Sequence, residues 1–155
     1  MADRVSASIT IGGTVTADQF AELTSMIVAH GLSTEWDGPD FTADQCISGE
    51  PLALFAHETP WGMFDDLEQY CCNHEIPYIR WSGGCVGSFG PERIVYGGKS
   101  GPLNYDVDED DHVVVHAHTI EQLGSMRAIR RYLKAAEIML PPFVVYADCG
   151  AVLTK

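Results

Sequence analysis

The residues best suited to chemistry are two histidines, His116 and His118, separated by a single residue. We predict a strand over 112–118, and residues two apart on a strand face the same side. Two imidazoles on one face can supply half of a metal site, which Asp108 or Glu121 would complete. Alternation on a half-exposed strand also creates such histidine pairs by chance. A metal site is therefore an alternative interpretation of this segment.

Cysteine chemistry is a second alternative, carried by Cys71, Cys72, His74 and Cys85. Structural zinc sites favour thiolates separated by two residues, whereas adjacent cysteines on a helix point about 100° apart. A thiol nucleophile would pair Cys85 with a histidine such as His116, but no helix N-terminus follows Cys85 to activate it. The number of cysteines is odd and their spacing is irregular, which is not typical of a secreted disulfide framework. We expect reduced, small, buried residues: Cys46, Cys71, Cys72, Cys85 and Cys149.

The glycine-rich segment 82–90 carries neither a lysine nor a following helix. A phosphate-binding loop needs its glycines between a strand and a helix N-terminus. Here we predict strands on both sides, over 77–81 and 92–97, so the segment is interpreted as a long hairpin connection. Three tryptophans could form a binding patch, although tryptophans more commonly serve core or half-buried packing: Trp36, Trp61 and Trp81.

The charge of the chain is large, negative and unevenly distributed. The 155 residues include 9 Lys and Arg against 22 Asp and Glu, for a net charge of −13. Such a balance argues against a protein whose main function is to bind phosphate backbones or an anionic membrane. Residues 5–79 contain twelve acids and neither Lys nor Arg. A second acidic cluster at 106–111 precedes a short basic block, formed by Arg127, Arg130, Arg131 and Lys134.

Periodicity and capping signals predict an α+β fold. Alternation over 5–11 predicts a strand, and the Thr16 and Gln19 pair predicts the start of a helix over 17–30. We predict further strands at 33–37, 51–57, 77–81, 92–97, 112–118 and 143–147, helices at 63–74 and 120–139, and loops at 38–50 and 99–111. A second capping box, Thr119 with Gln122, is expected to open the last helix.

The resulting architecture is a single domain over residues 1–155. Strands that alternate with helices predict a two-layer sandwich, in which a mixed or antiparallel sheet carries three helices on one face. Two β-α-β passes suggest a ferredoxin-like element. Met1-Ala2-Asp3-Arg4 does not open a signal peptide, and no segment approaches the roughly 20 apolar residues of a membrane span. We expect a soluble, cytoplasmic protein.

The acidity has two interpretations. Spaced carboxylates on an ordered face resemble the charge pattern of a nucleic acid backbone, and would steer the protein toward a basic groove. Alternatively, the acids serve only solubility or adaptation to salt, since the chain has twelve Asp and three Lys. On the first interpretation the contact residues are Glu35, Asp37, Asp40, Asp44, Asp65, Asp66 and Glu68, with Asp106, Asp108, Glu109, Asp110 and Asp111 as a second patch.

Three segments resemble uncharacterised acidic proteins of bacterial plasmids and phages. They are Ile9-Thr10-Ile11-Gly12-Gly13, Glu58-Thr59-Pro60-Trp61-Gly62 and Trp81-Ser82-Gly83-Gly84. The resemblance covers roughly the first hundred residues, and no catalytic signature comes with it. Through genetic context alone, it implies a role against host defence systems.

We therefore expect a non-enzymatic protein that binds and inhibits a basic nucleic-acid-handling complex, of the anti-CRISPR or anti-restriction type. This function needs no cofactor or metal, no direct contact with nucleic acid and no membrane. The alternatives are a small metal-binding or thiol-dependent enzyme that uses His116, His118 and Cys85, and an acidic domain without a charge-directed partner.

Overall fold

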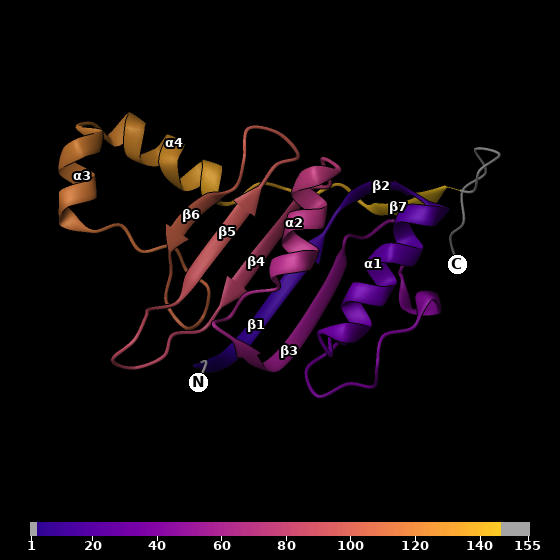
Figure 1. Ribbon diagram of the computed structural model, residues 1–155. Helices are drawn as coiled ribbons and strands as arrows, with labels where there is room; N and C mark the ends of the chain where they lie inside the picture. Colours follow the sequence, from indigo (N-terminus) through magenta and orange to yellow (C-terminus); the bar gives the residue numbers. More distant parts are fainter. Residues whose placement is uncertain (1–2, 147–155) are drawn as a thin grey trace.

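A five-stranded antiparallel sheet organises the protein (Figure 1), whose computed structural model describes residues 3–146. The strand order is β3-β1-β4-β5-β6, with β1 (Arg4–Ile11), β3 (Leu52–Pro60), β4 (Tyr78–Ser82), β5 (Glu92–Tyr96) and β6 (Leu103–Asp106). A separate two-stranded parallel sheet joins β2 (Gly13–Thr16) to β7 (Phe143–Tyr146). The predicted α+β class is confirmed.

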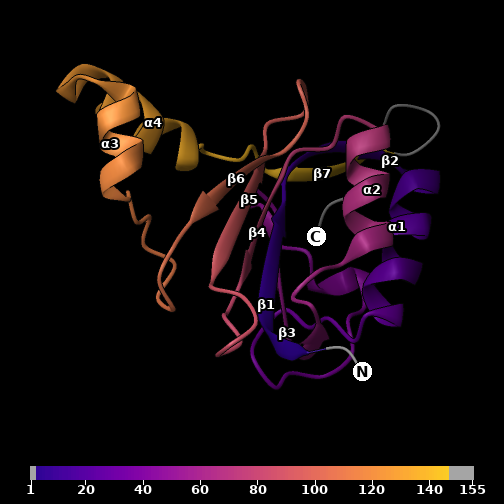
Figure 2. The same ribbon diagram turned by 60° about the vertical axis from the view of Figure 1, so that its left-hand side comes forward.

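Two helices, α1 (Ala17–Ala29) and α2 (Asp65–Asn73), cover one face of the large sheet (Figure 2). The predicted capping box of α1 is confirmed: Thr16 Oγ1 accepts the Gln19 N–H, and the Gln19 side chain accepts the Thr16 N–H. Leu23 and Ile27 are buried on the inner side of α1, within the main core that the sheet also lines. A 3-10 turn, η1 (Ala43–Gln45), lies in the predicted loop 38–50.

The remaining helices, α3 (Ala117–Leu123) and α4 (Met126–Ala136), lie beyond the β6 edge, on the side of the sheet away from α1 and α2. A second, smaller core there contains Val95 of β5, Tyr105 of β6 and Ala136 of α4. The expectation of three helices on one face is therefore wrong. Four helices are present in residues 3–146, and they lie on both sides of the sheet.

The predicted helix 120–139 is in fact two helices. Gly124 ends α3 with a left-handed φ of 77°, and Ser125 then caps α4 by accepting the Ala128 N–H. The expected cap at Thr119 is wrong, because α3 has already begun after His116.

The predicted strand 112–118 is also wrong. Val113 makes only an isolated bridge to Val107, and the last two residues of the segment already belong to α3. The sheet is instead extended by β6, within the predicted loop 99–111. The predicted strand 33–37 reduces to one bridge between Ser33 and Phe55.

One split β-α-β unit is present. Both β3 and β4 are antiparallel to β1, which lies between them, so β3 and β4 are parallel to each other and α2 connects them. The first pass differs, because α1 returns the chain to β3, the antiparallel neighbour of β1. The hairpin predicted between the strands at 77–81 and 92–97 is confirmed as β4 paired with β5.

Arg80 on β4 is a charged residue inside the fold, with 3% of its surface exposed. Its Nε donates to Glu68 Oε1 at 2.8 Å, and its Nη2 donates to Glu92 Oε1 at 3.1 Å. Its Nη1 donates to the Gly62 carbonyl at 2.8 Å and to Ser82 Oγ at 3.1 Å. Burial alone would lower the pKa of Arg80, but the two carboxylates raise it. The guanidinium thereby links α2, β4, β5 and the turn before α2.

Replacing Arg80 by Met should destabilise the protein by about 3 to 5 kcal/mol, because the change leaves Glu68 and Glu92 without their counter-charge. Urea denaturation followed by circular dichroism measures this loss. Adding Glu68→Gln and Glu92→Gln to Arg80→Met should recover part of it. The exposed Lys99→Met is the control and should change stability by less than about 0.5 kcal/mol. An Arg80→Met variant as stable as that control contradicts this account.

Candidate functional site

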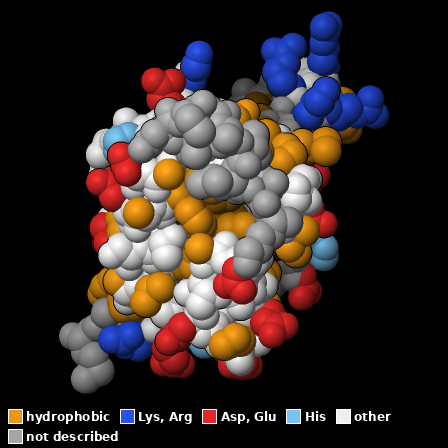
Figure 3. All heavy atoms as spheres, turned by 90° about the vertical axis from the view of Figure 1, so that its right-hand side faces the viewer, with side chains coloured by type: hydrophobic (Ala, Val, Ile, Leu, Met, Phe, Trp, Pro, Cys, Tyr) orange, Lys and Arg blue, Asp and Glu red, His pale blue; other side chains and the backbone are white. Residues whose placement is uncertain are grey.

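Acidic residues from separate segments meet at one end of the sheet. Asp66 lies in the first turn of α2, where its carboxylate contacts the Nε2 of His30 at the end of α1. Asp37, in the loop after α1, lies 3.4 Å from the Nε2 of His57 on β3. We call this the acidic end, formed by the C-terminus of α1, the N-terminus of α2 and the loop residues Glu35, Asp37 and Asp40. Figure 3 shows Asp and Glu side chains along the lower part of the face that carries α1.

The predicted contact residues differ in their availability. Glu35, Asp40 and Asp65 are exposed, and none of them has a side-chain hydrogen bond or ion pair with another described residue. Asp44 accepts a hydrogen bond from the Thr42 hydroxyl. Glu68 faces inward to Arg80 and is only 13% exposed, so it belongs to the interior network. Sequence alone does not distinguish such a carboxylate from a solvated one.

The second predicted patch serves mainly as a set of structural links. Asp106 pairs with His116 at 3.0 Å, and Asp111 pairs with Arg93 at 2.9 Å. The Glu109 carboxylate accepts the Gly84 N–H at 2.9 Å, which holds the turn at 108–112 against the β4–β5 loop. Most of these acids are therefore engaged within the protein.

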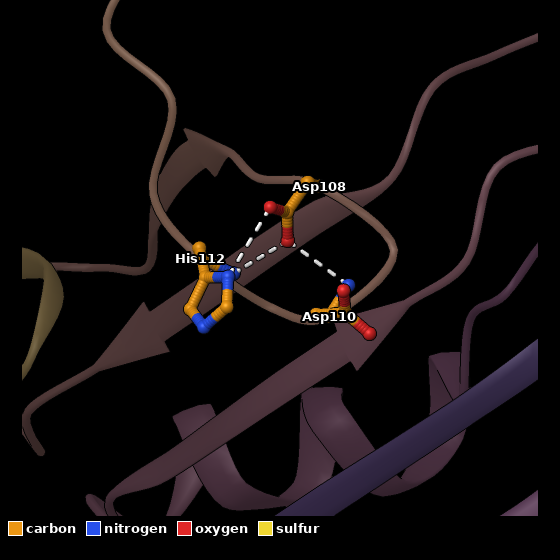
Figure 4. Close-up of side chains that lie close together, drawn as sticks. All are labelled: Asp108, Asp110 and His112. Carbon is orange, nitrogen blue, oxygen red and sulfur yellow. Dashed lines mark hydrogen bonds and ion pairs between the residues drawn. The ribbon is translucent and has the colours of Figure 1, made fainter.

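Asp108, Asp110 and His112 form the one group of three in residues 3–146 that could surround a metal ion (Figure 4). Their nearest ligand atoms lie within 4.8 Å of one another. Asp108 Oδ1 accepts the N–H groups of Asp110 and His112, each at 2.9 Å, and Oδ2 lies 3.2 Å from His112 Nδ1. These backbone hydrogen bonds lower the pKa of Asp108. The hydrogen bonds within the turn account for the cluster without an ion.

The histidines singled out by the sequence do not form the expected half-site. His116 precedes α3 and His118 lies in its first turn, so the strand that would align them is missing. Their rings stack with centroids 5.6 Å apart, and neither belongs to a three-residue ligand group in the described chain.

The cysteines are likewise dispersed. Cys71 is buried in α2, which raises the pKa of its thiol to about 12. The Cys72 sulfur lies 3.9 Å from the Tyr78 hydroxyl. Cys85 lies in the β4–β5 loop, and no hydrogen bond joins its thiol to a histidine among the described residues. Cys46 is half-buried, and Cys149 lies outside the described residues.

The structure also reveals a contact that the sequence did not indicate. Ser6 Oγ lies 2.8 Å from His57 Nδ1, and His57 Nε2 faces Asp37. This order of hydroxyl, imidazole and carboxylate is the one that activates a nucleophile. However, the Asp37 side chain is 83% exposed and lies 3.4 Å from the ring, so water competes for both partners. The contact arises at the irregular register of β1 against β3, which residue spacing does not disclose.

The tryptophans do not gather into one patch. Trp36 packs on Phe55 and His57, whereas Trp61 packs on Phe89. The indole N–H of Trp81 donates to the Asp108 carbonyl at 3.4 Å, which anchors the turn at 108–112 to β4. Each tryptophan thus serves a different local contact.

Comparisons with known proteins add no relative. The chain matches no protein-family model, and searches of curated proteins and of solved structures found no match. Within residues 3–146, no helix has the length and apolar character to cross a membrane.

The pairing of Asp66 with His30 should be visible in the pH dependence of stability. Partial burial alone would raise the pKa of Asp66, but the hydrogen bond and charge of His30 lower it. A depressed carboxyl pKa stabilises the fold above the unfolded value of about 3.8, and this contribution is lost as pH falls through the folded pKa. Asp66→Asn should therefore destabilise at pH 6 by less than about 1 kcal/mol, because Asp66 is half exposed.

Urea midpoints between about pH 2 and pH 6 measure this difference, which should shrink toward the acid end. Asp65→Asn is the matched control, because Asp65 occupies the same first turn of α2 and makes no contact with His30. Equal losses for the two variants at every pH would show that the His30 contact contributes nothing beyond the helix dipole.

Proposed function

We propose that the protein binds a basic surface of a nucleic-acid-handling protein through its acidic end and inhibits it by occupying that surface. The observation that carries the proposal is the absence of Lys and Arg from residues 5–79, which supply the acidic end. Glu35, Asp40 and Asp65 face solvent there without a partner among the described residues. A basic groove would supply the missing counter-charges.

Long-range attraction suits this mode of binding. Charges of one sign on one end of a protein raise the rate of association with an oppositely charged groove, and the effect falls as salt rises. Substrate nucleic acid presents a similar row of anions, so the two ligands would compete for the groove. Inhibition of this kind requires no catalytic group on the inhibitor.

The local structure holds this end in place. Asp66 is tied to His30, so the C-terminus of α1 and the N-terminus of α2 are linked. The loop after α1 is fixed by Phe41, which is 3% exposed, and by the Ser33 hydroxyl, which donates to the Gly38 carbonyl at 3.0 Å. An ordered arrangement of carboxylates loses little conformational entropy on binding.

The resemblance of three segments to plasmid and phage proteins favours one class of target. Plasmids and phages are attacked by host restriction enzymes and CRISPR-type complexes, whose basic grooves hold nucleic acid. We infer that a complex of this class is the partner.

The triple variant Glu35→Gln, Asp40→Asn and Asp65→Asn should lose binding, because it removes three solvent-facing charges from the acidic end. Crosslinking in the host, followed by affinity purification and mass spectrometry, should recover a nuclease or CRISPR-type complex with the unaltered protein. With the purified partner, the variant should bind on the order of tenfold more weakly at low salt and show a shallower salt dependence.

The matched control is Asp18→Asn, Glu121→Gln and Glu137→Gln, which makes the same change in net charge at exposed positions away from the acidic end. The control should bind as the unaltered protein does. If both triple variants weaken binding equally, only total charge matters and the acidic end is not the interface.

A further inference from the structure

Helix α4 concentrates positive charge in an otherwise acidic protein. Arg127, Arg130, Arg131 and Lys134 are spaced at i, i+3, i+4 and i+7, so they line one side of the helix. The stripe spans about 10 Å along the helix axis at 1.5 Å per residue. All four residues are exposed, and none makes a side-chain hydrogen bond or ion pair with any described residue.

The opposite side of α4 is attached to the sheet. Ala136 is fully buried against Val95 and Tyr105, and the Tyr132 ring lies 5.1 Å from the Tyr105 ring. Arg93 Nη1 donates to the Ala136 carbonyl at 2.8 Å, which places a cation at the C-terminus of α4. This attachment is made near the C-terminus of α4 and leaves the basic stripe facing outward.

The position of α4 separates the stripe from the acidic end. Figures 1 and 2 show α3 and α4 beyond β6, on the side of the sheet opposite α1 and α2. Figure 3 shows a group of Lys and Arg side chains at one upper corner, whereas Asp and Glu side chains are spread over the rest of this view with only isolated Lys or Arg side chains among them. Because surface charges are screened over about 8 to 10 Å, the acids of the acidic end weaken binding at α4 only modestly, and Glu137 at the C-cap is the acid closest in sequence to the stripe.

We propose that the basic stripe of α4 binds the phosphodiester backbone of a nucleic acid. Three of its four cations are arginines, whose planar guanidinium groups match phosphate oxygens with two hydrogen bonds each. A helix also fits the major groove of duplex DNA, where its side chains reach phosphates on either side. Contacts of this kind position a protein without reading sequence.

This inference goes beyond the proposed function and stands on a different surface. It also changes what the net charge implies. A net charge of −13 argued against nucleic acid as a ligand, but four of the nine Lys and Arg are gathered on α4, where the nearest acid in sequence is Glu137 at the end of the helix. The local charge at α4, and not the sum over the chain, decides which ligand approaches it.

Fluorescence anisotropy with the full chain and a labelled 20-base-pair duplex, at about 50 to 200 mM salt, tests the proposal. Four phosphate contacts predict a slope of log K against log salt of about −3.6, and Arg127→Gln with Arg131→Gln should reduce it to about −1.8. Changing the duplex sequence should leave the affinity unchanged. A single strand of the same length is measured in parallel. If the protein binds it more tightly than the duplex, the preferred ligand is single-stranded nucleic acid.

Two matched single variants provide the control. Lys134→Gln removes a cation from the stripe and should lower the slope by about one, whereas Lys99→Gln makes the same charge change in the β5–β6 loop and should leave it unaltered. Circular dichroism should show every variant folded, because the replaced side chains are exposed and make no side-chain hydrogen bond or ion pair with another described residue.

Several outcomes would overturn the proposal. One is the absence of duplex and single-strand binding at 50 mM salt. Another is an equal loss of affinity for Lys134→Gln and Lys99→Gln. Tighter binding to vesicles that contain phosphatidylserine would assign α4 to a membrane, and tighter binding to poly-glutamate would assign it to an acidic protein.

Discussion

The buried charge of Arg80 constrains much of this fold. A guanidinium inside a sheet requires acceptors on every side, and they come from α2, from β5 and from the turn that leads into α2. The backbone of that turn must come very close to β4. A Cβ on Gly62 would lie 2.5 Å from the Ser82 Cβ, and Gly62 adopts a φ of 67°, so glycine alone suits the position. The placement of α2 over the sheet, and with it one half of the acidic end, follows from these requirements.

The acids of this chain perform two kinds of work. Glu68, Glu92 and Asp111 neutralise arginines and join elements that are distant in sequence. Glu35, Asp40 and Asp65 are exposed and pair with no arginine among the described residues. The proposed interface therefore uses only the acids that the fold leaves free, and the count of acids overstates its size.

Local signals in the sequence predicted local structure well. Alternation identified β1, and the Thr16 and Gln19 pair located the start of α1. The failures lie where long-range contacts decide. The valines at 113–115 make only the bridge of Val113 to Val107, whereas the four residues of β6 pair with β5 over their whole length. Glu68 was predicted to be a surface contact because a sequence does not show which carboxylate faces an arginine. Arg80 and the Ser6 and His57 contact were missed for the same reason.

The four exposed cations of α4 and the exposed carboxylates at the start of α2 lie on opposite sides of the sheet, so these two groups of charges contribute an electric dipole to the molecule. Such a dipole experiences a torque in the field of a charged partner before any contact is made. Near a polyanion the protein turns so that α4 leads, and near a polycation it turns so that the acidic end leads. A field of this kind would orient the protein relative to a charged surface before contact.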